Sequence, residues 1–246
     1  HQTLEDDGPV VDVLVERQVH PAQAAVRDAA LDLVLVGDDV AGFERGLEGE
    51  PGAAVRARAD ELAGLAVVEG VSAAGGPACA LKWPNDVLLE GDKLAGILIE
   101  TAWSTDEASA VVIGIGTNVK GAEELAAKVG QLNADVPAQA RGAMPTALQR
   151  ALPNANLTDT LAAELNALEP ALQRFGAEGF APFQARWNAV HAYAGREVVL
   201  LEQGQELARG VAAGVDERGQ LLLDTAAGRL TVATGDVSLR LADGAA

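Results

Sequence analysis

The chain has 246 residues, a formal charge of −18 at pH 7, and 49% hydrophobic but only 3% aromatic residues. This length suits one substantial domain with a small second one, and a core built from Ala, Val and Leu favours a mixed α/β architecture over an all-β sandwich. The net negative charge argues against sequence-independent DNA binding, which needs clustered Lys and Arg, so we expect no DNA partner.

Cysteine content and hydropathy exclude further classes of protein. Cys79 is the single cysteine, which rules out an intrachain disulfide and a cysteine-built metal site. No apolar run reaches the roughly 18 residues of a membrane span, and no basic start precedes an apolar core as in a secretory signal. We therefore expect a cytoplasmic protein with no membrane partner.

The first part of the chain contains two runs that predict strands. Residues 10–15 read VVDVLV between turn residues and polar residues, and residues 31–36 form a second apolar run. Gln18 lies at the C-terminal end of the first run. From residue 61, apolar side chains recur at helical spacing until the Gly-Gly-Pro stop at 75–77, which predicts a helix packed on a sheet.

The middle of the chain alternates between strand and helix patterns. A polar Glu-Gly-Asp loop at residues 90–92 is of the kind that joins two strands of a hairpin. The predicted elements are strands at 80–89, 93–101 and 110–115, a helix or loop at 122–136, and helices at 157–176 and 180–191.

Beyond Tyr193 the pattern changes to short strands separated by turn residues. The runs lie at 197–201, 206–213, 220–224, 229–233 and 237–241. Five short strands in succession are typical of a small barrel. We therefore expect two domains, a larger one with a mixed sheet at residues 1–190 and the barrel at residues 191–246.

The most specific motif is KWPND at residues 82–86, followed by KLAGILIE from residue 93. One interpretation is structural: the Pro-Asn-Asp segment turns the chain, Trp83 packs in the core and Lys82 is solvated. The functional interpretation starts from the hairpin, which returns Lys93 beside the strand that carries Lys82. Two ammonium groups and the carboxylate of Asp86 then share one sheet face.

That combination is what a triphosphate site requires. Ammonium groups neutralise phosphate oxygens and stabilise charge that develops during transfer, while Asn85 and Asp86 can hold Mg²⁺ directly or through water.

A second motif, GIGTNV, begins at Gly114 at the end of a predicted strand. Its glycines permit close approach of a ligand or another backbone, and a β-bulge is an alternative of equal weight.

In this order, KWPND, KLAGILIE and GIGTNV resemble the core of the biotin protein ligases. The resemblance continues through PFQARWNAVHAYAGREVVL at 182–200 and GDVSLR at 235–240, and so covers residues 62–241. It implies an α/β (α+β) fold, in which a mixed-sheet catalytic domain of the biotin/lipoate ligase type precedes a small SH3-like β-barrel.

The resemblance also implies an activity. The family uses ATP to convert biotin into biotinyl-5′-AMP and transfers biotin to a lysine of a biotin carboxyl carrier protein, the acetyl-CoA carboxylase subunit. Mg²⁺ is the implied cofactor, and ATP and biotin are the implied substrates. A homodimer formed through a sheet edge is compatible with the family.

The same resemblance assigns roles to individual residues. Lys93 and Lys82 are the implied catalytic residues, and Lys93 reaches both biotin and the activated phosphate. The implied biotin site consists of Gln18, Lys93 and Gly96. The implied ATP and Mg²⁺ site consists of Lys82, Asn85, Asp86, Gly114, Gly116, Asn118 and Arg240, with Asp86 as the Mg²⁺ ligand, directly or through water.

One family motif is absent from this sequence. The ligases that it resembles carry a Gly-Arg-Gly-Arg-Arg-Gly-like loop after the strand that ends in glutamine, and that loop folds over biotinyl-adenylate. Here Gln18 is followed by VHPAQAAVRDAALDL, and the arginine pair at 56–58 lacks the glycines. Residues 19–61 are therefore divergent, replaced or corrupted. A non-catalytic family member and a lipoate- or octanoate-attaching relative stay open as alternatives.

Other reactive side chains receive plainer interpretations. His20 and His191 are expected at the surface, and no two histidines are spaced for a metal site. Cys79 is expected to be a small buried hydrophobe, in contrast to the nucleophile of the related octanoyl transferases. Some ligases of the family carry an N-terminal helix-turn-helix, which this sequence lacks, so we expect no transcriptional repression.

Overall fold

The computed structural model describes most of the chain from residue 51 onward. The described residues are 11–12, 30–37, 51–104, 109–134, 136, 141–202, 204–233 and 237–242. Before residue 59 and at residues 101–110 the description is limited to the backbone.

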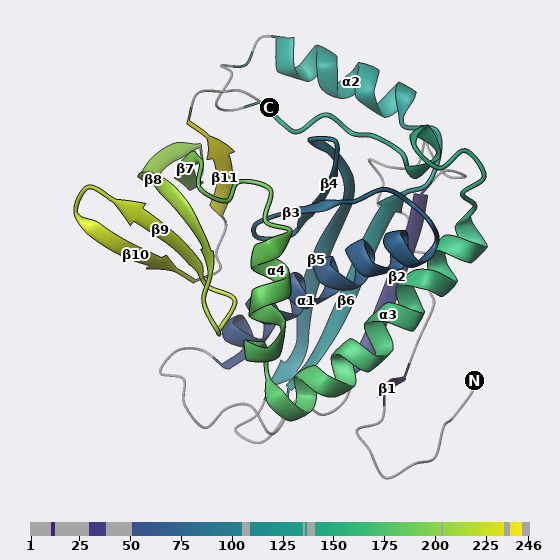
Figure 1. Cartoon of the computed structure of the whole chain (residues 1–246), viewed down its shortest axis with the longest axis horizontal. Helices are drawn as coiled ribbons and strands as arrows, with labels where there is room; N and C mark the ends of the chain where they lie inside the picture. Colours follow the sequence, from purple (N-terminus) through teal and green to yellow (C-terminus); the bar gives the residue numbers. More distant parts are fainter. Residues whose placement is uncertain are drawn as a thin grey trace.

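A six-stranded sheet forms the centre of the molecule (Figure 1). Its strands are β1 (Val11–Asp12), β2 (Ala30–Gly37), β3 (Ala80–Lys82), β4 (Asp86–Leu89), β5 (Asp92–Ser104) and β6 (Ser109–Asn118). They lie in the order β1-β2-β6-β5-β4-β3, and each of these described pairings is antiparallel. The sheet is thus antiparallel and not mixed as expected, because hairpins join β3 to β6 in sequence and hairpins produce antiparallel neighbours.

One predicted strand, at residues 80–89, is divided into β3 and β4. The chain reverses at the segment that begins with the cis Trp83–Pro84 peptide bond. Proline has no N–H group, so it cannot continue a ladder of strand hydrogen bonds. The reversal pairs Lys82 with Asp86, which places the two ends of KWPND opposite each other.

Two helices cover one face of the sheet. Helix α1 (Pro51–Ala73) packs on β5 and β6 and crosses α3 (Leu157–Glu178). A Cβ atom on Gly70 would lie 2.9 Å from backbone atoms of Glu164, so the crossing depends on glycine at this position. The helix predicted from residue 61 is confirmed, and it begins earlier, at Pro51.

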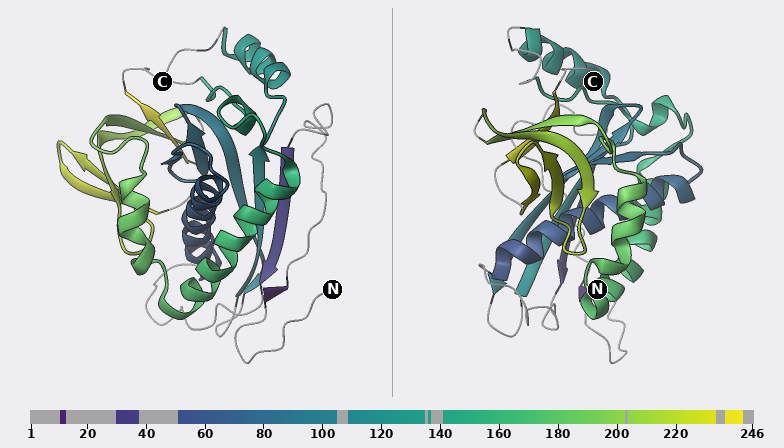
Figure 2. Two further views of the ribbon diagram at one scale, coloured as in Figure 1. Left: turned by 45° about the vertical axis from the view of Figure 1, so that its right-hand side comes forward. Right: turned by 60° about the vertical axis from the view of Figure 1, so that its left-hand side comes forward.

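The other helical segments lie outside this layer. They are α2 (Glu123–Ala134), the 3₁₀ turns η4 (Leu148–Arg150) and η5 (Ala181–Phe183), and α4 (Gln184–Ala189). Figure 2 shows α2 at one end of the molecule, apart from α1 and α3, and α2 buries none of its residues. Among the described residues, no helix is long and apolar enough to cross a membrane.

A second, five-stranded sheet follows. Its strands are β7 (Glu197–Glu202), β8 (Gln205–Val215), β9 (Leu221–Thr225), β10 (Gly228–Val232) and β11 (Val237–Leu241). They are antiparallel in the order β10-β9-β8-β7-β11, which confirms all five predicted strands. Between β10 and β11 no pairing closes this sheet in the described part of the chain. The α+β fold class is confirmed.

The two sheets share one hydrophobic core, which contains Trp83 from the turn between β3 and β4 and Leu221 from β9. The indole Nε1 of Trp83 donates to the carbonyl of Gly219 at 3.4 Å. On α4, the side chain of Asn188 accepts a hydrogen bond from the Val215 amide at 2.7 Å and donates to its carbonyl at 3.1 Å. These bonds fix the second sheet next to the KWPND turn.

Candidate active site

The sheet register brings parts of all three motifs into one row. Lys82 pairs with Asp86, Asp86 with Gly96, and Gly96 with Gly116. Because paired residues point to the same face of a sheet, these four positions share the face opposite α1 and α3. The intervening residues, such as Ile115, are buried on the helix side.

Two ammonium groups converge on one carboxylate in this row. Lys82 Nζ lies 2.7 Å from Asp86 Oδ2, and Lys93 Nζ forms an ion pair with Asp86 Oδ1. The Lys82 side chain is 6% exposed, whereas that of Lys93 is 40% exposed. Lys93 is thus the ammonium group that a ligand on this face can reach.

Burial and charge act in opposite directions within this cluster. Burial lowers the pKa of Lys82, and the attraction of Asp86 offsets part of that effect. Burial by itself raises the pKa of Asp86, but Lys82 and Lys93 together hold it below its ordinary value. Asp86 therefore carries its negative charge at neutral pH.

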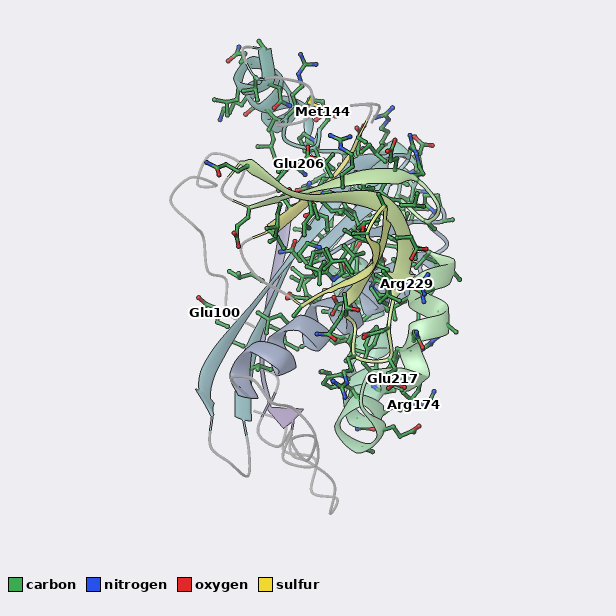
Figure 3. The ribbon with its side chains drawn as sticks, turned by 90° about the vertical axis from the view of Figure 1, so that its left-hand side faces the viewer. Glu100, Met144, Arg174, Glu206, Glu217 and Arg229 are labelled. Carbon is green, nitrogen blue, oxygen red and sulfur yellow. The ribbon has the colours of Figure 1, made fainter. Side chains whose placement is uncertain are left out.

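Glycine at position 96 makes room for the Lys93 side chain. A Cβ atom on Gly96 would lie 3.1 Å from both Cε and Nζ of Lys93. Further along the same strand face, Leu98 is 64% exposed, and Figure 3 shows Glu100 projecting from β5 on the side away from α1 and α3. This face is open, and an apolar group can lie on it.

The backbone of Lys93 is held from two sides. Its amide donates to the carbonyl of Met144 at 2.7 Å, and its carbonyl accepts from the Thr146 amide at 3.0 Å. The side-chain amide of Asn118 also donates to this carbonyl, at 3.4 Å. Asn118 therefore contacts the residue that carries the exposed ammonium group. The sequence did not predict that residues 144–146 contact Lys93, because a loop that pairs with a strand about 50 positions away shows no local periodicity.

Asn85 joins the KWPND turn to β5. Its side-chain amide donates to the carbonyl of Ile97 at 2.9 Å, and its own carbonyl accepts from the Ile97 amide at 2.9 Å. These bonds orient the side chain between β4 and β5, next to Gly96. Asn85 is thus tied to β5 directly before Asp86, the carboxylate of the ammonium cluster.

Arg240 approaches the cluster from β11. Its positive charge lowers the pKa of Lys82, and it also acts on Tyr193, whose pKa is raised chiefly by burial. Its Nε atom is buried and has no hydrogen-bond partner among the described residues. A buried guanidinium N–H without a partner is costly, and an acceptor supplied by a ligand would satisfy it.

The other predicted positions have different outcomes. Gln18 lies outside the described residues, as does most of the segment at 19–61. Gly114 lies on the open face beside Leu98, where an added Cβ would be 3.3 Å from the Leu98 carbonyl oxygen. Cys79 is buried as expected, and burial raises the pKa of its thiol to about 11.

The expectation of a surface position for His191 was wrong. The side chain is 7% exposed and its ring packs on that of Trp187 with centroids 4.8 Å apart. Burial lowers its pKa to about 4. The backbone explains this position, because residues next to His191 pair with Leu81 of β3 and so carry the ring into the core.

No group of three or more His, Cys, Asp or Glu side chains could hold a metal ion among the described residues. A Mg²⁺ ion that accompanies a nucleotide needs less than this, since it takes one or two carboxylates and completes its shell with phosphate oxygens and water. Asp86 supplies the carboxylate for such a site, and both of its oxygens pair with ammonium groups here, so an ion would replace one of these contacts.

Two family models match this chain. The Biotin/lipoate A/B protein ligase family matches residues 55–118, which include KWPND and KLAGILIE. The Biotin protein ligase C terminal domain matches residues 193–240, which contain the second sheet up to β11.

Curated relatives are similar over most of the chain. The biotin–[acetyl-CoA-carboxylase] ligase of Paracoccus denitrificans is 34% identical over 197 residues, which are 78% of this chain and 76% of the relative. The bifunctional ligase/repressor BirA of Escherichia coli K12 is 31% identical over 182 residues, 73% of this chain and 52% of the relative. The chain therefore spans about half the length of the BirA relatives.

Solved structures share the fold. The biotin protein ligase from Aquifex aeolicus superimposes with a TM-score of 0.64 at 24% identity, over 86% of this chain and 82% of that one. The Aquifex aeolicus ligase in complex with biotin and ATP gives a TM-score of 0.63 at 24% identity, over 86% of this chain and 79% of that one.

Proposed function

The chain belongs to the biotin protein ligase family, and from this premise we propose that it activates biotin with ATP and attaches it to a lysine of a carrier protein. The observation that carries the proposal is the pair of ammonium groups, from Lys82 and Lys93, that contact Asp86. They lie on an open sheet face that also contains Gly96 and Gly116. Such a face offers cations for phosphate, bare backbone for close approach, and apolar surface beside them.

The first step joins the two substrates. The biotin carboxylate attacks the α-phosphorus of ATP, an oxygen–phosphorus bond forms, and pyrophosphate leaves. Negative charge builds up on the phosphoryl oxygens, where the exposed ammonium of Lys93 neutralises it and buried Lys82 adds a fixed positive field. Arg240 supplies a donor from the second sheet, since its buried Nε has no partner among the described residues.

The second step transfers biotin. The neutral ε-amine of a carrier lysine attacks the acyl carbon of biotinyl-5′-adenylate, an amide bond forms, AMP leaves and the amine proton is released. The named activity of the Paracoccus relative suggests a biotin carboxyl carrier protein of acetyl-CoA carboxylase as the acceptor. We extend that acceptor to this chain.

Mg²⁺ is included in the proposal as the companion of ATP. Asp86 would hold it directly or through water, with Asn85 close by, and the ion would draw charge from the departing pyrophosphate. Gln18, Gly114 and Asn118 keep their proposed places in the biotin and adenylate sites. The division into domains at residues 1–190 and 191–246, the absence of DNA binding and a cytoplasmic location likewise stay proposals.

Pyrophosphate release from Mg-ATP tests this function. Wild-type chain should release pyrophosphate with biotin and much less with lipoate or octanoate. Lys93→Ala should lower kcat/KM by at least about a hundredfold, because a charge-stabilising group at the reacting phosphate is lost. Arg174→Ala removes an exposed cation from α3 and should leave the rate unchanged. Release driven by lipoate would favour the lipoate-attaching alternative.

The missing arginine-glycine loop motivates one rival function. A family member without the loop could keep the fold and bind nucleotide or carrier protein without making biotinyl-adenylate. Biotin binding measured by isothermal titration, with and without Mg-ATP, separates the two. A folded wild-type chain that binds ATP but neither binds biotin nor releases pyrophosphate would be the non-catalytic relative.

A further inference from the structure

A buried carboxyl group lies directly behind the proposed adenylate site. Glu164 of α3 is 1% exposed, and its Oε1 accepts a hydrogen bond of 2.8 Å from Thr117 Oγ1, which is itself fully buried. Its other oxygen, Oε2, has no partner among the described residues. Burying a carboxyl group with a single donor is costly, so the pair calls for a functional account.

Thr117 stands between the two motif residues of β6. Gly116 and Asn118 face the open side of the sheet, while Thr117 faces the helices. The Asn118 side chain bonds to the Lys93 backbone at 3.4 Å, and the Lys93 ammonium pairs with Asp86. A continuous chain of contacts therefore runs from Glu164 to the ammonium cluster.

The base of this chain of contacts is closely packed. Glu164 sits where α3 crosses α1 at Gly70, a close approach that any side chain at position 70 would block. The residues one turn away on α3, Thr160 and Leu168, are buried and uncharged. The Glu164 backbone is thus held where two helices cross, and its side chain reaches from there to the sheet.

We propose that Glu164 is a positioning residue, which through Thr117 holds the end of β6 so that Gly116 and Asn118 stand correctly at the reacting face. This inference rests on the proposed function for its kinetic consequences. An apolar contact would fill the same space, but a hydrogen bond also fixes the direction of the strand end.

The titration of Glu164 gives the pair a measurable signature. Burial raises its pKa to about 7, and the Thr117 bond opposes that effect. On α1, Glu69 pairs with Arg186 at 2.7 Å, and the shift of the Glu164 pKa has no contribution from Glu69 or from buried Glu61. From the strands, the partners of Thr117 are Leu31 and Ala95, which are uncharged. The pKa therefore reports on burial and on Thr117.

The sign of the pH effect follows from the raised pKa. The neutral acid stabilises the fold, and this contribution is complete below the ordinary glutamate pKa and is lost as pH rises through about 7. Above that pH an ionised carboxylate lies behind β6 with one donor. Stability should therefore fall between about pH 4.5 and pH 7, and positioning should weaken as the folded carboxyl ionises around pH 7.

Three variants test the proposal in the full chain. Glu164→Gln keeps the acceptor and removes the titration, Thr117→Val removes the donor at equal volume, and Glu169→Gln makes the same change as the first at an exposed position of α3. For each, kcat and KM for biotin-dependent pyrophosphate release and the thermal midpoint without ligand are measured between about pH 5 and pH 8.5.

The proposal expects Glu164→Gln to retain wild-type kinetics at the acid end, to lose the wild-type decline in thermal midpoint between about pH 5 and pH 7, and to lose the wild-type decline in kcat/KM as pH rises past about 7. Thr117→Val should lower kcat/KM by about tenfold while the chain stays folded. Glu169→Gln should match wild type throughout. If Thr117→Val lowers only the thermal midpoint, or if Glu164→Gln keeps the wild-type pH profile, the positioning role is overturned.

A failure of the proposed function gives a different result. A wild-type chain that releases no pyrophosphate contradicts the ligase activity. In that case the positioning role is tested by the affinity for ATP, which isothermal titration measures for the wild type and for Thr117→Val. Thr117→Val weakens that binding if the pair positions the strand end. Unchanged binding, with wild-type folding, overturns the inference.

Discussion

Lys82 and Asp86 face each other across the turn of one hairpin and form a 2.7 Å ion pair whose side chains are only 6% and 12% exposed. A charged pair this well buried has lost most of its hydration, and each partner depends on the other for compensation. The pair thus couples the stability of the KWPND turn to the charge of the proposed phosphate site.

Removal of the Asp86 charge should destabilise the fold. In Asp86→Asn the buried ammonium of Lys82 loses its counter-charge, and we expect a loss of about 3 kcal/mol in the free energy of unfolding. Urea denaturation at pH 7 measures this change. The matched control is Asp224→Asn, which removes a carboxylate from an exposed pair with Arg229. A change no larger at position 86 than at 224 would contradict the pairing described here.

A methyl group at position 96 should disturb chemistry more than folding. In Gly96→Ala the new Cβ lies 3.1 Å from Lys93 Cε and Nζ, and the flexible lysine must move. We expect kcat/KM for pyrophosphate release to fall by about tenfold, because a misplaced charge stabilises the reacting phosphate poorly. The unfolding free energy should change by less than about 1 kcal/mol.

Gly130→Ala is the control for that substitution. Gly130 lies within α2, where an added Cβ meets only Met144 Cε at 3.9 Å, an ordinary contact. Alanine should stabilise this helix by up to about 1 kcal/mol and leave the kinetics unchanged. Equal losses of kcat/KM in both variants would show that the kinetic effect of Gly96→Ala does not come from the displacement of Lys93.

The buried ring of His191 should make the fold sensitive to acid. Its pKa is lowered to about 4 by burial, so the unfolded chain binds the proton more readily. The contribution of the neutral ring is complete above the ordinary histidine pKa and is lost as pH falls toward 4. His191 should therefore cost about 2 kcal/mol of stability between pH 7 and pH 5.

His191→Phe isolates this contribution. Phenylalanine keeps the ring contact with Trp187 and removes two ring nitrogens that have no hydrogen-bond partner among the described residues. Urea denaturation of both proteins at the two pH values gives the difference directly. Glu164 shifts stability in the opposite direction over this range, but its effect is common to both proteins and cancels. If the difference in unfolding free energy between wild type and His191→Phe does not change with pH, the claim that His191 is buried in its neutral form is contradicted.

The bond between α4 and β8 should hold the second sheet in place. In Asn188→Ala the Val215 amide loses its partner at 2.7 Å and the Val215 carbonyl keeps only the bond from Gln184 at 2.9 Å, and we expect a loss of about 2 kcal/mol in stability. Because Arg240 reaches the cluster from this sheet, KM for ATP should rise as well. Asn166→Ala, at an exposed position on α3, should change neither quantity.

The pattern of apolar residues was enough to predict most elements of the fold. Apolar runs bounded by turn residues located β5 and β6, and the short runs after Tyr193 located the second sheet, because both are local sequence patterns. The division of residues 80–89 was predicted only as an alternative, in which the Pro-Asn-Asp segment turns the chain, and proline within the run carried that signal. The family motifs also predicted which residues meet at Asp86, since a short hairpin fixes its own register.

Contacts between distant segments could not be predicted in this way. The bonds from residues 144–146 to Lys93 and from Glu164 to Thr117 join elements that sequence spacing does not relate. The burial of His191 has the same origin, since the pairing of its segment with β3 is a tertiary contact. Periodicity reports which face of an element is apolar, and it does not report what packs against a polar exception.

Biotinylation of a carrier domain is the measurement that tests the central claim most directly. The wild-type chain is incubated with biotin, Mg-ATP and a biotin carboxyl carrier domain, and the carrier is weighed by mass spectrometry. The proposed function predicts the mass of one added biotinyl group, its loss in Lys93→Ala, and its loss when the acceptor lysine of the carrier is replaced by arginine. A folded wild-type chain that leaves the carrier unmodified, or a Lys93→Ala variant that modifies it at the wild-type rate, would contradict the account.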